Sequence, residues 1–229
     1  MRNELLWIFM LLINFSIITG IYKKYGKEGL YFYIPVSIIA ANIQVLKTIN
    51  IFGMTATLGN IIYATTFLIT DILSENHTKN EAKKAVEIGF ISMITFTLLM
   101  NLALTFVPNE YDFAQKSMEI LFKPMVRILI ASLLAYVSSQ TYDVWAYDKL
   151  KQKTNKIWIR NNGSTMISQL IDSLVFTMVA FVGTMPFKPL MGILISTYVL
   201  KWIVALVDTP FLYLVSIDNK KVKVEVKKN

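Results

Sequence analysis

Seven long apolar runs, separated by short charged segments, constrain this chain more than any other feature of its sequence. They lie at residues 4–22, 29–47, 55–74, 85–107, 126–148, 164–184 and 189–217. A helix that crosses a membrane needs about 20 mostly apolar residues. The pattern therefore predicts an all-α, polytopic membrane helix bundle of about seven transmembrane helices, a six-helix core plus one. The last run is the longest, so we expect that Pro210 kinks it or that its first turns lie outside the bilayer.

Composition supports a membrane protein and argues against several other classes. The chain is 55% hydrophobic, above the roughly 45–50% of a soluble domain. Its net charge of +8 does not indicate a nucleic-acid partner, because the basic residues lie between the apolar runs. The absence of cysteine excludes disulfides and thiolate chemistry. His77 is the one histidine, which leaves little for a metal site, and we expect no cofactor.

The placement of Lys and Arg residues orients the predicted helices. With seven crossings, sixteen of these residues fall on one side and six on the other, and Lys201 lies inside a run. The positive-inside rule then places the N-terminus outside and the C-terminus in the cytoplasm. We expect one transmembrane domain, residues 1–217, and a basic cytoplasmic tail, residues 218–229, that is disordered or rests on anionic lipid. The external segment 108–125 suits a short interfacial helix or a solvated loop.

The most polar stretch runs from Trp158 to Asp172 and reads WIRNNGSTMISQLID. It predicts a basic loop with a turn at Gly163, followed by the first half of an apolar helix. A carboxylate in hydrocarbon is costly, so we expect Asp172 to face a partner or a water-filled cavity.

Other polar residues fall within the runs or at their ends, and with Asp172 they form the set of candidate substrate-binding residues. The set is Asp71, Gln140, Asp143, Arg160, Asn161, Asn162, Ser168, Gln169, Asp172, Lys201 and Asp208. Ser168, Gln169 and Asp172 share one helix face because they are three and four residues apart. Structural alternatives stay open: a polar residue inside a membrane often joins two helices. A purely structural pair between Lys201 and a carboxylate is one such alternative, and Asp71 and Arg160 also suit interfacial charges.

Several short stretches occur in a recognisable order and spacing. They are Ala41-Asn42, TFLITD at 66–71 with Glu75, WIRNN at 158–162, Ser164-Thr165, Ser168-Gln169-x-x-Asp172, and Lys201-x-x-x-Ala205-x-x-Asp208-Thr209-Pro210. In these stretches the chain resembles the queuosine precursor transporters, also described as the vitamin uptake transporter family, over about residues 41–215. It departs from the family pattern at Tyr63-Ala64, where Phe-Pro is common, and at His77-Thr78, where Tyr-Gly is common.

The resemblance implies a multi-pass transporter of the bacterial cell membrane that imports 7-deazaguanines. These are 7-cyano-7-deazaguanine, its 7-aminomethyl analogue and queuine. Such a base presents an N1–H and a 2-amino group side by side, a donor pair that one carboxylate can accept. We hypothesise that Asp172 is the principal reader of this edge, with Asp143 as the alternative. Candidate partners for the rest of the base are then Arg160, Asn161, Asn162 and Gln169, with Tyr136, Phe176 or Trp202 stacking on the ring.

Three other functions compete with a self-sufficient transporter. The alternative within transport is a substrate-binding membrane subunit of a multi-component, ATP-driven vitamin importer, whose ATPase would be a separate chain because no Walker motif is present. An intramembrane enzyme is disfavoured, since no nucleophile–base pairing can be located. A scaffold would leave the deep charges without a purpose. The transport hypothesis requires that acids and amides from the last three runs converge on one wet chamber; homo-oligomerisation stays open.

Overall fold

The structure is a computed structural model that describes residues 2–153 and 157–226. Within these ranges, the side chains of residues 143, 144, 147, 148, 150–153, 157–165, 205, 206, 209 and 216–226 lie outside the description. The elements are α1 (Arg2–Gln44), β1 (Thr48–Ile51), β2 (Met54–Thr57), α2 (Asn60–Asn76), α3 (Lys79–Ala103), α4 (Gln115–Phe122), α5 (Met125–Lys153), α6 (Ile157–Phe181) and α7 (Phe187–Val226).

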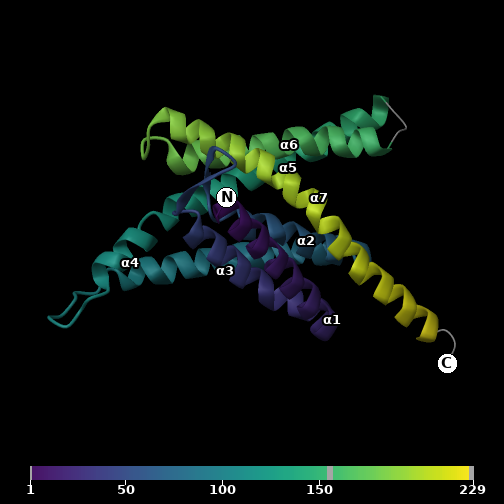
Figure 1. Ribbon diagram of the computed structural model, residues 1–229, viewed down its shortest axis with the longest axis horizontal. Coiled ribbons are helices and arrows are strands. Elements are labelled where there is room, and N and C mark those ends of the chain that lie inside the picture. Colours follow the sequence, from purple (N-terminus) through teal and green to yellow (C-terminus); the bar gives the residue numbers. More distant parts are fainter. Residues whose placement is uncertain (1, 154–156, 227–229) are drawn as a thin grey trace.

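The helices form two groups that α7 connects (Figure 1). Helices α5 and α6 run side by side as one long pair, while α1, α2 and α3 pack together below them. Helix α7 begins beside the α5–α6 pair and crosses obliquely to α2 and α1. In the described chain, four helical segments are long and apolar enough to cross a membrane: Arg2–Gln44, Lys79–Ala103, Gln115–Tyr142 and Phe187–Val204. The protein is thus built as a multi-pass helical bundle.

Helix α1 contains the first two predicted runs as two arms that fold back on each other. Gly26 separates the arms with φ 60° and ψ −149°, a conformation that glycine adopts without the steric penalty of a Cβ. The arms are joined by a hydrogen bond from the Tyr33 hydroxyl to the Asn14 side-chain oxygen. Gly29 allows close packing just after the bend, because a Cβ there would lie 2.7 Å from the Ile21 side chain.

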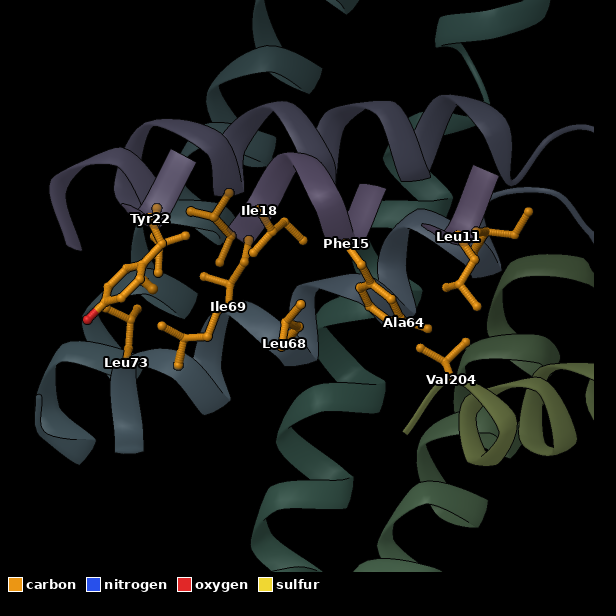
Figure 2. Close-up of a cluster of buried hydrophobic side chains, with 14 of the residues drawn as sticks. Leu11, Phe15, Ile18, Tyr22, Ala64, Leu68, Ile69, Leu73 and Val204 are labelled. Atoms are coloured by element: carbon orange, nitrogen blue, oxygen red, sulfur yellow. The ribbon is translucent and has the colours of Figure 1, made fainter. Parts of the chain in front are cut away.

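The largest apolar core lies between the first arm of α1 and helix α2. Apolar side chains of α1 recur every three or four residues and point toward α2, with Val204 of α7 closing one end (Figure 2). The labelled members are Leu11, Phe15, Ile18 and Tyr22 of α1, and Ala64, Leu68, Ile69 and Leu73 of α2. This spacing is that of one helix face, which explains why α1 and α2 pack lengthwise.

A β-hairpin precedes α2, so the prediction of a continuous helix over 55–74 is wrong at its start. Strands β1 and β2 pair antiparallel with Ile51 opposite Met54. The two turn residues, Phe52 and Gly53, both have positive φ, as the most favoured two-residue hairpin turn requires. The flanking Thr and Ile residues favour strands because they are β-branched. Ser196 of α7 fixes the hairpin by donating a hydrogen bond to the Thr55 carbonyl oxygen at 2.9 Å.

One further expectation is wrong, another is wrong in one of its two alternatives, and a third is confirmed. The predicted loop with a turn at Gly163 is helical, since α6 begins at Ile157; a single glycine costs a helix only about 1 kcal/mol. Residues 218–226 continue α7, so the disordered alternative for the tail is wrong there; extending an existing helix needs no new nucleus. A tail that rests on anionic lipid stays a prediction. Pro210 lies inside this uninterrupted helix.

The short helix predicted within 108–125 is present as α4.

Arg127, in the first turn of α5, ties α5 to the C-terminal end of α6. Its guanidinium donates hydrogen bonds to the carbonyl oxygens of Val179, at 2.6 Å, and Val182. A cation at a helix C-terminus also interacts favourably with the helix dipole. Arg127 therefore adds hydrogen bonds between α5 and α6 at an end where Ile128, Ala131, Ala180 and Phe181 also pack in one buried cluster.

Replacing Arg127 with methionine is expected to destabilise the protein by about 1.5–3 kcal/mol, the usual contribution of hydrogen bonds to a charged group. The thermal unfolding midpoint of the detergent-purified variant measures this loss. The matched control is Lys123→Gln, which removes a nearby cation whose partner, Glu119, lies one helical turn away on an exposed surface and which should leave the midpoint nearly unchanged. Equal midpoints for Arg127→Met and the wild type would contradict the fastening role.

Candidate functional site

Two neighbouring cavities lie where the two helix groups meet. The larger has a volume of about 430 Å³ and receives side chains from α1, α2, α3, α5 and α6. The smaller, of about 30 Å³, lies against α7 and the N-terminal end of α2. Four residues, Asn42, Tyr63, Ser132 and Asp172, line both. The larger volume falls within the range of about 300–1,000 Å³ that small-molecule pockets occupy, so the larger cavity is the candidate binding site.

The two cavities meet at a buried ion pair. Lys201 of α7 donates a hydrogen bond from Nζ to Oδ2 of Asp172 on α6. The Lys201 side chain is 6% exposed and that of Asp172 is 13% exposed. The Lys201 ammonium also lies 5.8 Å from the centre of the Tyr63 ring, within the range of a cation–π interaction.

Contacts near Lys201 hold its helix, α7, in place. Thr197, one turn before Lys201, accepts a hydrogen bond from the Asn60 side chain at 2.9 Å, which fixes α7 against the first residue of α2. Gly59 precedes α2 and lies so close to the second arm of α1 that a Cβ would be 2.2 Å from the Ala41 carbonyl oxygen. These contacts hold α1, α2 and α7 together around the smaller cavity.

The charges of Lys201 and Asp172 determine which hydrogen bonds the site can offer to a ligand. A buried charge without a partner is strongly unfavourable, whereas a paired and hydrogen-bonded one is tolerated. The bond from Lys201 uses Oδ2 of Asp172, and the same carboxylate faces both cavities. A carboxylate has about four acceptor positions, so Asp172 can still accept hydrogen bonds from a ligand in the larger cavity.

Aromatic side chains from three helices line the larger cavity. Tyr63 and Phe67 of α2 form an edge-on pair with centroids 6.0 Å apart. Phe90 of α3 and Tyr136 of α5 form a second pair, 4.9 Å apart. All four border the larger cavity, so a flat ligand there has ring faces and edges available on two sides.

Four of the predicted site residues meet in this region. Asp172, Gln169 and Gln140 line the larger cavity, and Lys201 lines the smaller one. Three others do not line either cavity: Ser168 and Asp208 are buried elsewhere, and Asp71 is exposed near the end of α2. The side chains of the remaining predicted residues, Asp143, Arg160, Asn161 and Asn162, lie outside the described part of the chain.

The three aromatic residues predicted to stack on the ligand lie in different places. Tyr136 borders the larger cavity and Phe176 the smaller. Trp202 borders neither of them and instead packs edge-on against Tyr198, with ring centroids 6.3 Å apart. Its depth in the apolar run therefore reflects packing along α7.

Sequence reasoning did not select Asn42, Asn60 or Tyr63 as site residues. Asn42 borders both cavities and Asn60 borders the smaller one. A side-chain amide within an apolar run was a signal for both, although such residues more often join helices. Tyr63 gave no separate signal, because an aromatic residue in an apolar run is ordinary. Among the described residues, no group of His, Cys, Asp or Glu could hold a metal ion.

Comparison with known proteins identifies the family. Residues 57–215 match the family described as "Putative vitamin uptake transporter". The chain belongs to this family. The resemblance seen in the sequence is thereby confirmed, and the family is one of transporters and not of enzymes.

Three relatives carry a more specific name. The chain is 42% identical over 216 residues to the "Probable queuosine precursor transporter" of Bacillus subtilis, covering 93% of this chain and 94% of the relative. It is 25% identical over 144 residues to the "Queuosine precursor transporter" of Escherichia coli, covering 63% of each. The corresponding protein of Haemophilus influenzae is 27% identical over 144 residues, or 62% of this chain and 59% of the relative. No solved structure matches.

Proposed function

We propose that this transporter imports queuosine precursors, 7-deazaguanine bases, into the cytoplasm of a bacterial cell. The names of its relatives support the substrate class, since the Bacillus subtilis protein is similar over nearly the whole chain. The positive-inside distribution of Lys and Arg supports an external N-terminus and a cytoplasmic C-terminus.

The observation that carries the proposal is the Asp172 carboxylate, held by Lys201 and facing a cavity of about 430 Å³. A 7-deazaguanine presents N1–H and its 2-amino group side by side. Asp172 accepts these two donors, since charge-assisted bonds of this kind are about twice as strong as neutral ones. The ring stacks against the aromatic residues that border the cavity, Tyr63 and Tyr136 among them.

The rest of the proposed site comes from α5 and α6. Gln140 and Gln169 border the same cavity as Asp172 and supply amide groups for the other polar atoms of the base. The proposal also keeps four residues because of where they lie in the sequence, near Gln140 and Gln169: Asp143, Arg160, Asn161 and Asn162. Lys201 acts on the ligand through Asp172.

Uptake by the purified chain in proteoliposomes tests the proposal and separates it from the ATP-driven alternative. With radiolabelled 7-cyano-7-deazaguanine outside and no ATP present, we expect the label to accumulate above the level in protein-free liposomes. An excess of unlabelled 7-aminomethyl-7-deazaguanine or queuine should compete according to the affinity of each, whereas adenine should not. Binding without passage across the bilayer would favour a substrate-binding subunit, and absence of binding by all three bases would overturn the proposed substrate class.

A further inference from the structure

Gln169 carries a polar atom that the protein leaves unsatisfied. It lies on α6, one turn before Asp172, and borders the larger cavity beside it. Its Oε1 atom is buried and has no hydrogen-bond partner among the residues whose side chains the structure describes. Buried acceptors in folded proteins are nearly always paired, so an unpaired acceptor beside a cavity points to a partner that comes from the ligand.

Two other unpaired oxygens on the same helix provide a contrast. The hydroxyls of Ser173 and Thr177 are also buried without a partner, but neither residue borders a described cavity. A serine or threonine hydroxyl in a helix can rotate to bond the carbonyl four residues earlier. Gln169 has no such local solution for its amide oxygen, and its position next to Asp172 sets it apart.

We propose that Gln169 determines specificity for the amino group of the base, a role that rests on the proposed function. Residues three apart on a helix have Cβ atoms about 5–6 Å from each other, so Gln169 and Asp172 face adjacent parts of one ligand edge. Asp172 accepts N1–H and the nearer hydrogen of the 2-amino group. The second amino hydrogen points away from the carboxylate, and Oε1 of Gln169 accepts it.

The consequence is a penalty for any base without the amino group. A 7-deazahypoxanthine keeps N1–H and the carbonyl oxygen but has no 2-amino group. It satisfies Asp172 in part and leaves the Gln169 oxygen buried and unpaired. Sites built around hydrogen-bonding groups reject such analogues far more strongly than apolar pockets reject a change in size.

The test pairs changes in the ligand with changes in the protein. Dissociation constants of 7-deazaguanine and 7-deazahypoxanthine are measured on the detergent-purified wild type and on Gln169→Leu, Gln169→Glu and Ser173→Ala. We expect the wild type to prefer 7-deazaguanine and Gln169→Leu to reduce this preference by about tenfold, the worth of one hydrogen bond to a buried acceptor. Gln169→Glu keeps an acceptor oxygen and should keep most of the preference, and Ser173→Ala should keep all of it.

The outcomes separate the role of Gln169 from the proposed function. If Gln169→Leu binds both bases with the wild-type ratio, the assignment of Gln169 is overturned while the function stands, because the wild type still binds 7-deazaguanine. If the wild type binds neither base, the proposed function fails and the inference fails with it. Gln169→Met replaces the leucine variant if the latter does not purify as a folded protein.

Discussion

Replacing Asp172 with asparagine is expected to abolish uptake of 7-deazaguanines and to destabilise the protein. The change removes the acceptor of the donor pair and leaves the Lys201 ammonium buried without its partner. Removing one member of a buried ion pair typically destabilises a protein by about 3–5 kcal/mol. Uptake in proteoliposomes and the thermal unfolding midpoint in detergent measure the two effects separately.

A double variant distinguishes a lost binding group from a lost fold. In Asp172→Asn with Lys201→Met, neither charge remains, so the unfolding midpoint should return toward that of the wild type because no unpaired charge is buried. Uptake should stay absent, since the carboxylate is still missing. A double variant that transports normally would show that the pair is structural only, and normal uptake by Asp172→Asn alone would remove Asp172 from the site.

Replacing Gly59 with alanine is expected to have the largest effect on stability among the glycine substitutions. The added Cβ would lie 2.2 Å from the Ala41 carbonyl oxygen and 2.7 Å from the Val45 amide nitrogen. Both are backbone atoms: Ala41 lies in the last turn of α1 and Val45 directly follows this helix. Backbone atoms cannot move aside as the end of a side chain would. We expect a loss above the roughly 1–3 kcal/mol of ordinary overpacking, together with loss of ligand binding, because Gly59 borders the smaller cavity.

Gly20→Ala is the matched control for this prediction. Gly20 lies in the first arm of α1, and a Cβ there meets nothing within 4 Å. Alanine favours a helix over glycine by about 1 kcal/mol, so Gly20→Ala should raise the unfolding midpoint or leave it unchanged. The reading of Gly59 as a close-approach site would be wrong if both variants unfold at the wild-type temperature.

The helical part of the fold was predictable because it depends on local sequence. Apolar runs of membrane length identified the arms of α1 and the helices α3, α5, α6 and α7, although α6 begins at residue 157 and not at 164, and α7 ends at residue 226 and not at 217. The hairpin before α2 was not identified, since the apolar, β-branched residues of 48–57 fit a strand as well as the start of a buried helix. The choice between them is made by distant contacts, such as that between Ser196 and Thr55.

The charged residues of the site could be predicted from the sequence, but which acid pairs with Lys201 could not. Position within an apolar run singled out Asp172, Lys201 and Asp208 as candidate site residues. The structure pairs Lys201 with Asp172 across two helices, while Asp208 lies away from both cavities. Which acid meets a given base depends on how α6 and α7 pack, and helical spacing within one segment carries no information about that.

The split between the hairpin and α2 has an electrostatic consequence. Helix α2 has 17 residues, or about 25 Å of helix, less than the roughly 30 Å thickness of the hydrocarbon layer. The first turn of α2 lies in the protein interior, since Asn60 and Ile61 are buried, and Asn60 and Asp172 border the same small cavity. The N-terminal end of a helix carries a partial positive charge, so the start of α2 at Asn60 brings a fixed, non-titrating source of positive potential to the Asp172 carboxylate.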